Sequence, residues 1–304
     1  MDAFPHFHRH LPADVAIAAG LALLSALAFA VAIVAQQRAA ARVSDEAARS
    51  SDFARHLLRD PRWVAGIAGN AVGFTLQALA LHYGSLLVVQ PLLVASFLFA
   101  LPLSARLSHA RLPRSVWLWE IVLAVSLTVF VIIGDANHGA DHATRGRWLA
   151  ASVVMGPLLV ACLLLGRRAQ GAARSSSLAI GVGLLGGVLA VLTKTVVAEL
   201  SHSLVAAVSS WPLYALIVVG LSGTYLQQLS FQAGDLHTSL PIITVLEPIV
   251  AAIMGLTMFH ERLRVAGVRT VLLAAAVVIM VIATVAVARS EASYQEGPTD
   301  DASG

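Results

Sequence analysis

The sequence predicts an all-α integral membrane protein with about nine transmembrane helices, arranged as two inverted-topology four-helix repeats with a linking helix between them. Three observations predict this fold class. The chain is 58% hydrophobic and only 12% charged, whereas soluble domains are about half apolar and about a quarter charged. The apolar residues gather in runs near the roughly 20 residues that a helix needs to cross a bilayer. Part of one stretch, residues 223–263, also has an earlier counterpart in the same chain.

The internal repeat is the observation that decides the architecture. Residues 223–263 read as two apolar helices joined by a very short turn around Gly234. Sliding the chain by 150 positions aligns seven identical residues over nineteen positions without a gap. The pairs are Gly73/Gly223, Leu76/Leu226, Gln77/Gln227, Leu79/Leu229, Gly84/Gly234, Leu86/Leu236 and Pro91/Pro241. Leucine matches are expected between any two membrane helices, but the Gln, Pro and Gly matches are harder to obtain by chance.

Composition also excludes several classes of function. The arginines lie in short loops between apolar runs, where they set membrane topology, so we expect no nucleic-acid partner. The single cysteine, Cys162, lies in an apolar run, which excludes an internal disulfide and a cysteine-based metal site. No phosphate-binding loop, zinc pattern or serine elbow is present. We therefore expect no catalytic residue, no metal site and no enzyme activity, and no cofactor beyond a coupling proton or cation.

The chain begins with a polar tail, residues 1–13. The tail carries His6, His8 and His10, and a solvated, disordered segment is favoured over a metal-binding histidine tract. The first apolar run covers residues 15–35 and is predicted to be a transmembrane helix. It is too long for the core of a signal peptide, and no basic region precedes it.

A charged segment, residues 39–61, separates the first span from the others. Phe53, Leu57 and Leu58 fall on one helical face, which fits an interfacial amphipathic helix; a solvated loop is the alternative. Residues 289–304 are acidic and contain Gly, Pro and Ser, which favours a disordered tail. Between these segments lie eight further apolar runs of spanning length: 63–83, 86–105, 116–134, 148–166, 178–200, 211–231, 236–259 and 265–288.

The arginines in the loops predict the orientation of the chain. On the side of the amino terminus we count five of them, and on the other side thirteen. Because cytoplasmic loops carry the excess of basic residues, the amino terminus is predicted to lie outside and the carboxyl terminus in the cytoplasm. The Ala- and Arg-rich composition hints at a GC-rich bacterial genome, so we expect a multi-pass protein of the bacterial cytoplasmic (inner) membrane.

The number of spans between the repeat copies sets their relative direction. The copies begin at the second and the seventh span, and this odd offset makes them run in opposite directions. Inverted repeats of this kind are typical of secondary transporters, whose substrate site lies near the midplane where the halves meet. We therefore divide the chain into a first repeat (1–145), a linking helix (146–170), a second repeat (171–288) and a cytoplasmic tail (289–304).

The second half of the chain resembles the drug/metabolite transporter superfamily. Its EamA-type signature has a proline-bearing helix that ends in Gly-Glu-Arg-Leu, and His260 stands here in place of that Gly. The matching residues are Leu246, Glu247, Pro248, Ala251, Ala252, Glu261, Arg262 and Leu263. The family usually has ten helices as five plus five, whereas this chain lacks the second helix of each half and adds a linker. The resemblance implies transport of a small organic metabolite or drug-like solute.

With nine predicted spans, the chain also resembles the NIPA-like magnesium transporters, a branch of the same superfamily. Phe74 occupies the place of that branch's Glu, and hard cations prefer several oxygen ligands, so magnesium transport is the alternative function. A non-transporting membrane scaffold or partner subunit is a further alternative. The residues that match the branch's spacing are Trp63, Gly66, Gly73, Gln77, Pro91 and, as its helix lysine, Lys194.

Lys194 and Glu247 are the leading candidates for solute binding. An ammonium inside the bilayer costs about 3 kcal/mol on insertion scales, so Lys194 is predicted to face a cavity or a partner; the alternative is that it snorkels to the outer interface. Glu247 is the one carboxylate near the centre of a predicted span, where burial favours the protonated form. It suits a proton-coupling site, a gate formed with Lys194, or a structural hydrogen bond.

Amides and prolines complete the candidate site. Gln77 and Gln227 are related by the repeat and would approach the pseudo-twofold axis from opposite sides, for substrate contact or for an interhelical hydrogen bond. The remaining polar candidates are Gln228, Gln90, Asn70 and Tyr225. Prolines inside helices free carbonyl groups that can bind an ion or a polar solute, or they only kink the helix. Those predicted to break helices and act in gating are Pro91, Pro241 and Pro248.

Other notable residues receive structural interpretations. Glu120 lies one turn into a helix at the membrane interface, beside Trp117 and Trp119. The motifs Gly69-x-x-x-Gly73 and Gly183-x-x-x-Gly187 are predicted to let helices approach closely. A solvated outer loop is favoured over a metal site for Asp135, His138, Asp141 and His142. The expected partners are the lipid bilayer and a small solute, and a homodimer is left open.

Overall fold

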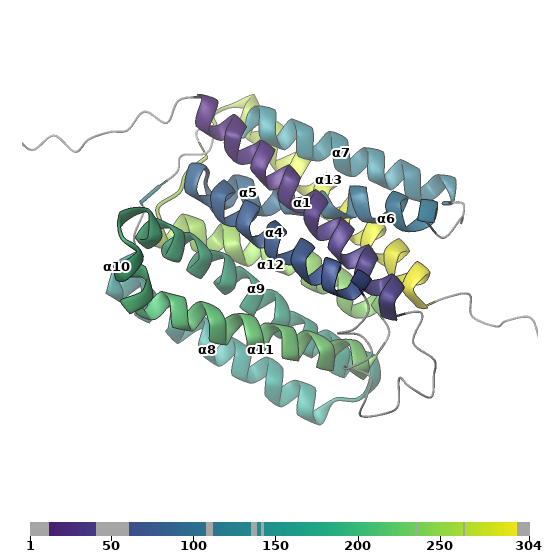
Figure 1. Cartoon of the computed structure of the whole chain (residues 1–304). Helices are drawn as coiled ribbons and strands as arrows, with labels where there is room; N and C mark the ends of the chain where they lie inside the picture. Colours follow the sequence, from purple (N-terminus) through teal and green to yellow (C-terminus); the bar gives the residue numbers. More distant parts are fainter. Residues whose placement is uncertain are drawn as a thin grey trace, which may run out of the picture.

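The computed structural model describes residues 12–40, 61–107, 112–134, 139–140, 143–234, 236–263 and 265–296. Residues 1–11 of the predicted histidine tail, residues 41–60 of the predicted amphipathic segment, and the residues considered for an outer-loop metal site lie outside these ranges. The described chain is a bundle of α-helices joined by short connections (Figure 1).

The helices follow the predicted spans closely. In chain order they are α1 (Pro12–Ala40), α4 (Pro61–Tyr83), α5 (Leu86–Leu93), α6 (Ser96–Leu107), α7 (Arg114–Ile133), α8 (Arg145–Arg168), α9 (Gly171–His202), α10 (Leu204–Ser209), α11 (Trp211–Ala233), α12 (Leu236–Met258) and α13 (Val268–Glu296). Eight helical segments of the described chain are long and apolar enough to cross a membrane, with α5 and α6 together forming one of them. The predicted all-α membrane fold is confirmed.

The remaining predicted span, 211–231, is the helix α11, which has the length but not the hydropathy of the other eight. Its second half carries the adjacent amides Gln227 and Gln228 among Ser and Thr residues. Polar side chains of this kind lower the mean hydropathy of a helix without shortening it.

The third predicted span is divided into α5 and α6 by a turn at Val94 and Ala95. The break follows Pro91 by one turn. Proline has no amide hydrogen to donate, and its ring crowds the preceding turn. The amides of Val94 and Ala95 instead bond three residues back, to the carbonyls of Pro91 and Leu92, at 3.2 and 3.0 Å.

The other two predicted helix breaks, at Pro241 and Pro248, are absent. The helix α12 continues from Leu236 to Met258 through both prolines. The kink alternative describes them better, since neighbouring helices can support a proline inside a transmembrane helix. The helix α13 likewise continues to Glu296, so the segment predicted as a disordered tail begins as helix.

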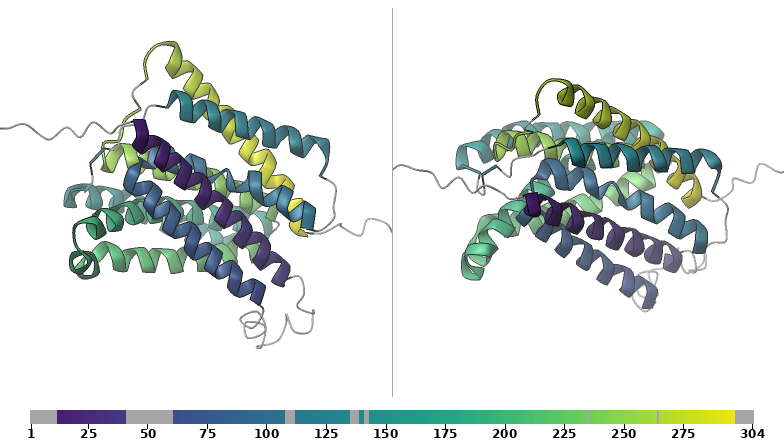
Figure 2. Two further views of the ribbon diagram at one scale, coloured as in Figure 1. Left: turned by 45° about the horizontal axis from the view of Figure 1, so that its top comes forward. Right: turned by 90° about the horizontal axis from the view of Figure 1, so that it is seen from above.

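Two helices, α1 and α9, organise the packing. The helix α1 packs along α4 and against α5 and α6, and α9 packs along α11, α12 and α8. The helix α13 lies beside α7 on one side of the bundle, as both views in Figure 2 show. The helix α5 also contacts α12.

Glycines permit the close approach of these helices, as predicted. A Cβ placed on Gly183 of α9 would lie 2.7 Å from the Cβ of Leu246 on α12, and one placed on Gly73 of α4 would lie 2.6 Å from the ring of Phe29 on α1. Buried serines add hydrogen bonds between helices. The Ser25 hydroxyl donates to the carbonyl of Gly73 at 2.7 Å, and Ser175 and Ser230 each donate to the other's carbonyl at 3.0 Å.

The helix bounds repeat at the same offset as the sequence. The helix α11 begins and ends 150 residues after α4, and α12 begins 150 residues after α5. In Figure 1, α4 and α11 run in opposite directions across the bundle.

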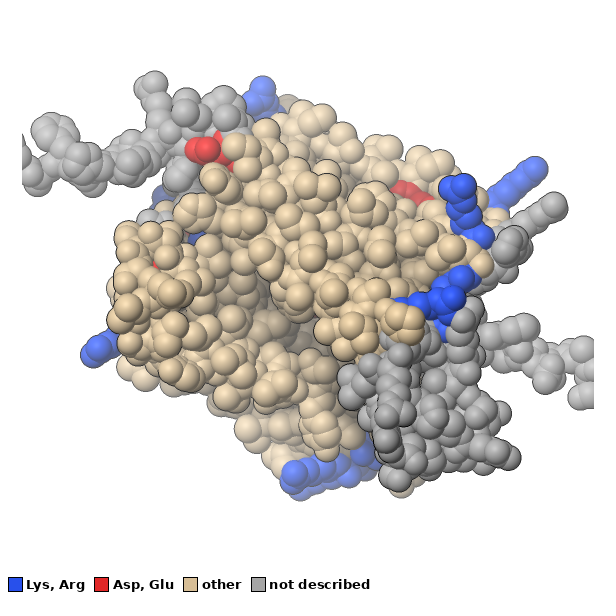
Figure 3. All heavy atoms as spheres, in the orientation of Figure 1, with Lys and Arg blue, Asp and Glu red and all other residues tan. Residues whose placement is uncertain are grey.

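The outer surface suits contact with lipid. Large apolar side chains are exposed along the described helices, most of all along α8, which buries little of its length. Lys and Arg side chains lie near the ends of the molecule and leave the broad middle of the visible face without them (Figure 3). The same view shows a hollow between α4 and α11, which both pack on α9.

Candidate functional site

A buried ion pair between α9 and the segment that follows α12 lies near one end of the bundle. Lys194 lies on α9, eight residues before that helix ends, and its side chain is only 2% exposed. Its Nζ lies 2.6 Å from Oε1 of Glu261, which is 0% exposed. Lys194 therefore does not snorkel to the surface, because its charge is met inside the protein.

The same carboxylate caps α5. Oε1 of Glu261 accepts the amide hydrogen of Leu86 at 2.9 Å, and Oε2 accepts that of Leu87 at 3.0 Å. The first amides of a helix have no partner within the helix, and the residue before α5, Ser85, makes no side-chain capping bond. An anion is also stabilised by the positive end of the helix dipole. Glu261 thus binds two partners, the ammonium of Lys194 and the amino terminus of α5.

Glu261 reaches this position because the chain folds back after α12. The helix ends at Met258, and His260 then adopts a φ of 54°, a left-handed conformation that is unfavourable for residues with a Cβ. The amide of Glu261 donates to the carbonyl of Gly255 at 3.1 Å. Phe259, between them, is fully buried, and its ring centre lies 4.9 Å from Nζ of Lys194, within the range of a cation–π contact.

Groups from the segment between α7 and α9 hold this returning segment, residues 259–263, from the other side. Arg147, near the start of α8, donates from Nη1 to the carbonyl of Met258 at 2.7 Å, and its Nη2 contacts Nε2 of His260. The amide of Ala140 donates to the carbonyl of Phe259 at 2.7 Å. The returning segment is therefore held on both sides.

The packing around the carboxylate leaves no spare room. A Cβ placed on Gly255 would lie 2.6 Å from Oε2 of Glu261. A buried charge that loses its partner is strongly destabilising, whereas an intact pair roughly balances its own desolvation. Loss of either charge would therefore leave its partner buried and uncompensated.

The other leading candidate, Glu247, is placed separately. It lies half-buried on α12 against Gly186 of α9. A Cβ placed on Gly186 would lie 2.9 Å from the carboxyl carbon of Glu247. Lys194 is eight residues farther along α9, about 12 Å at the helical rise. Glu247 therefore does not form the gate with Lys194 that the sequence suggested. Within the described residues it makes no hydrogen bond or ion pair, which leaves its carboxyl available to a solute or a proton.

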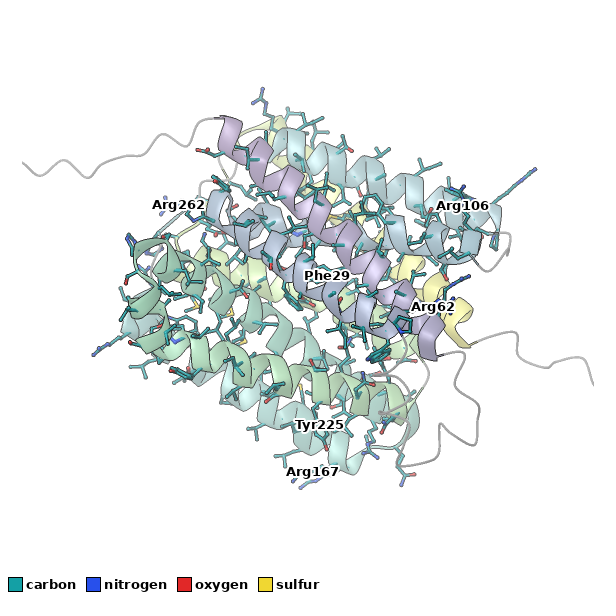
Figure 4. All side chains as sticks on the ribbon, in the orientation of Figure 1. Phe29, Arg62, Arg106, Arg167, Tyr225 and Arg262 are labelled. Atoms are coloured by element: carbon teal, nitrogen blue, oxygen red, sulfur yellow. The ribbon has the colours of Figure 1, made fainter. Side chains whose placement is uncertain are left out.

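The predicted amides and Tyr225 are spread over several environments. Gln77 and Gln90 are buried, and the Nε2 of Gln90 has no hydrogen-bond partner in the part of the chain that the structure describes. Asn70 and Gln227 are half-buried, whereas Gln228 is exposed. Tyr225 is 68% exposed on α11 (Figure 4). Gln90 and Pro91 are buried neighbours on α5, whereas Tyr225 and Gln228 are exposed on α11.

Some residues of the site were not predicted from the sequence. In the sequence, Glu261 stands out only as part of a family signature and Arg147 only as a loop arginine that sets the orientation, and no role is predicted for Phe259. Glu120, interpreted as an interfacial residue, is buried, and its Oε1 has no partner within the described chain. No three His, Cys, Asp or Glu side chains of the described chain come together in a way that could hold a metal ion.

The long apolar helices, the lipid-facing surface and the charges buried inside the bundle define a multi-pass helical membrane protein. The chain is 34% identical over 270 residues to the uncharacterized protein Cgl0250/cg0304 of Corynebacterium glutamicum, an alignment that covers 88% of this chain and 93% of that protein. The chain belongs to the same family as this bacterial protein. No family model matches the chain, and no solved structure matches it.

Proposed function

We propose that the protein is a secondary transporter of the drug/metabolite type, which moves a small organic solute across the bacterial cytoplasmic membrane by alternating access. Its amino terminus lies outside and its carboxyl terminus in the cytoplasm. The two halves of the chain, before and after the linking helix α8, act as the two moving parts.

The recurrence of helix bounds carries this proposal. The pair α4 and α5 and the pair α11 and α12 begin 150 residues apart, and the same offset aligns their Gln, Pro and Gly residues. The directions of α4 and α11 in the bundle are opposite. Inverted repeats provide two nearly equivalent arrangements of one fold, which is the basis of alternating access around a central site.

Polar groups inside the bundle support a solute pathway. Glu247 on α12 and Gln90 on α5 are polar side chains with unused hydrogen-bonding capacity in the described chain. Their helices contact each other where the two halves meet. Polar groups within transmembrane helices are costly and commonly mark substrate or ion pathways. We assign Glu247 to proton coupling and Gln77, Gln90 and Gln227 to solute contact.

The distribution of arginines supports the orientation. Within the described residues, the helix ends that would face the cytoplasm carry Arg38, Arg62, Arg106, Arg114, Arg167, Arg168, Arg174 and Arg289, and the opposite ends carry Arg145, Arg147, Arg262 and Arg269. Arg62, Arg106 and Arg262 are labelled in Figure 4, the first two at one end of the bundle and the third at the other. An excess of basic residues is typical of the cytoplasmic side.

The test is solute flux in proteoliposomes that contain the purified protein. The probes are a mixture of radiolabelled amino acids, ethidium, and Mg²⁺ followed by an entrapped dye. We expect the wild type to move one of the organic probes and Glu247→Gln to lose most of that flux, while Glu199→Gln, near an end of α9, keeps it. Flux of Mg²⁺ alone would favour the magnesium alternative, and no flux of any probe would favour a scaffold.

A further inference from the structure

We propose that Lys194 and Glu261 form a latch that closes the transport path at one end, the end predicted to face outside, and that this latch opens once in each transport cycle. The inference rests on the proposed function, since a latch has a task only if the path opens and closes. It adds a gating element that lies away from Glu247 and the amide side chains.

The latch connects parts of the chain that must separate for this end to open. Lys194 belongs to α9 in the second half, and the amides of Leu86 and Leu87 belong to α5 in the first half. Glu261 is bonded to both. The returning segment that carries Glu261 is also tied to Ala140 and Arg147, from the connection between the halves. One carboxylate therefore closes the interface between the two halves at this end.

The acidic partner of the latch lies in a loop and not on a packed helix face. Glu261 lies beyond the end of α12, in a segment whose backbone is kept in place by hydrogen bonds and by the left-handed residue His260. Such a segment can move without unwinding a transmembrane helix. Hinge positions of this kind, at the ends of helices, absorb the backbone changes of domain motions.

The first half of the sequence has no counterpart of this pair. The helix α1 holds the place that α9 holds in the second half, and it has no charged residue between Asp14 and Arg38. Residues 108–113, which follow α6 as the returning segment follows α12, contain no acidic residue. The corresponding positions of the first half therefore cannot form this ion pair, although the helices recur. The two ends of the path must close by different means, so loss of the latch should favour one access state over the other.

Two buried serines provide matched reporters for this difference. Ser85 immediately precedes α5 at the latched end, and Ser239 lies in the first turn of α12 at the opposite end. Both are almost fully buried, and both hydroxyls have no partner within the described residues. Each is replaced by cysteine in a Cys162→Ser background, and a membrane-impermeant maleimide is applied to spheroplasts and to inside-out vesicles.

With an intact latch we expect slow labelling of Ser85→Cys. In Glu261→Gln and in Lys194→Met we expect its labelling from the outside to rise about tenfold, because breaking a buried pair removes the stabilisation of the closed state. Labelling of Ser239→Cys from the inside should stay the same or fall. A reversed pair, Lys194→Glu with Glu261→Lys, should also label fast, because a lysine at position 261 cannot accept the amide hydrogens of Leu86 and Leu87.

Two outcomes would overturn the latch. Equal rises at both reporters would mean that the variants only loosen the fold, and unchanged labelling of Ser85→Cys would mean that the pair is structural. The labelling needs no solute, so its result is separate from that of the flux assay. A protein that changes access on loss of the pair but moves none of the probes would keep the latch and contradict the proposed solute class.

Discussion

The ammonium of Lys194 on α9 and the carboxylate of Glu261 after α12 meet at 2.6 Å inside the bundle, 67 positions apart in the sequence. Lys194 is the one lysine in the chain. Its carboxylate partner also caps α5, so the pair links a helix of each half. This relationship leads to predictions about stability, packing and orientation.

The pair should show strong energetic coupling. Lys194→Met and Glu261→Gln should each lower the free energy of unfolding by about 3 kcal/mol, because each leaves a buried group without its partner. The double variant should lose clearly less than the sum of the two, since no uncompensated charge remains. Unfolding in mixed detergent micelles measures this cycle, with Glu199→Gln as the control carboxylate. Additive losses would show that the two charges do not interact.

Gly255 should be required for the position of Glu261. Gly255→Ala would place a methyl group 2.6 Å from Oε2 of Glu261, so the carboxylate must move and α5 must lose its cap. We expect a thermal stability similar to that of Glu261→Gln. The control is Gly156→Ala on α8, where a Cβ meets nothing within 4 Å and where alanine favours the helix by about 1 kcal/mol. Equal stability of the two alanine variants would contradict this view of the site.

His260 should tolerate glycine better than alanine. Its φ of 54° favours glycine, which has no Cβ to crowd the backbone, by about 1 kcal/mol over other residues. Both substitutions remove the contact with Arg147, so the difference between them reports the backbone alone. We expect His260→Gly to unfold at a higher temperature than His260→Ala. The reverse order would mean that the turn is not left-handed in the membrane.

The starts of α4 and α11 should lie on opposite sides of the membrane. Arg62→Cys, at the start of α4, should react with an impermeant maleimide only in inside-out vesicles. Ser209→Cys, two residues before α11, should react only in spheroplasts. The reason is the odd number of spans between these helices, together with the excess of arginine on the cytoplasmic side. Labelling of both from one side would contradict the inverted repeat.

The sequence predicts the helices well and the contacts between them poorly. Runs of apolar residues near the spanning length locate each long helix, since only helices satisfy their own backbone in lipid, but α9 begins seven residues before its predicted start and α13 ends eight residues after its predicted end. Helix faces are harder to assign, because lipid and protein interior are both apolar and leave no polar side to orient a helix. This is why Gln77 and Tyr225 entered the same candidate site, although one is buried and the other is exposed.

The partner of Lys194 was missed for a specific reason. Glu247 lies within a predicted span, where a partner for a buried ammonium is expected, whereas Glu261 lies beyond the predicted end of that span. Only the fold-back at His260 returns Glu261 to the interior, and a histidine does not signal a left-handed turn as a glycine would. The cost of burying Lys194 was correctly a reason to expect a partner, but it did not identify which carboxylate would be used.

The central claim is that the two halves carry a solute across the membrane by alternating access around Glu247. Counterflow in proteoliposomes tests it most directly, with an organic probe that the wild type transports loaded inside and its labelled form added outside. We predict that labelled solute accumulates transiently in the wild type and in Glu199→Gln, and fails to accumulate in the Gln77→Ala, Gln227→Ala double variant. Simple equilibration without accumulation, or the same accumulation in that double variant, would contradict the account.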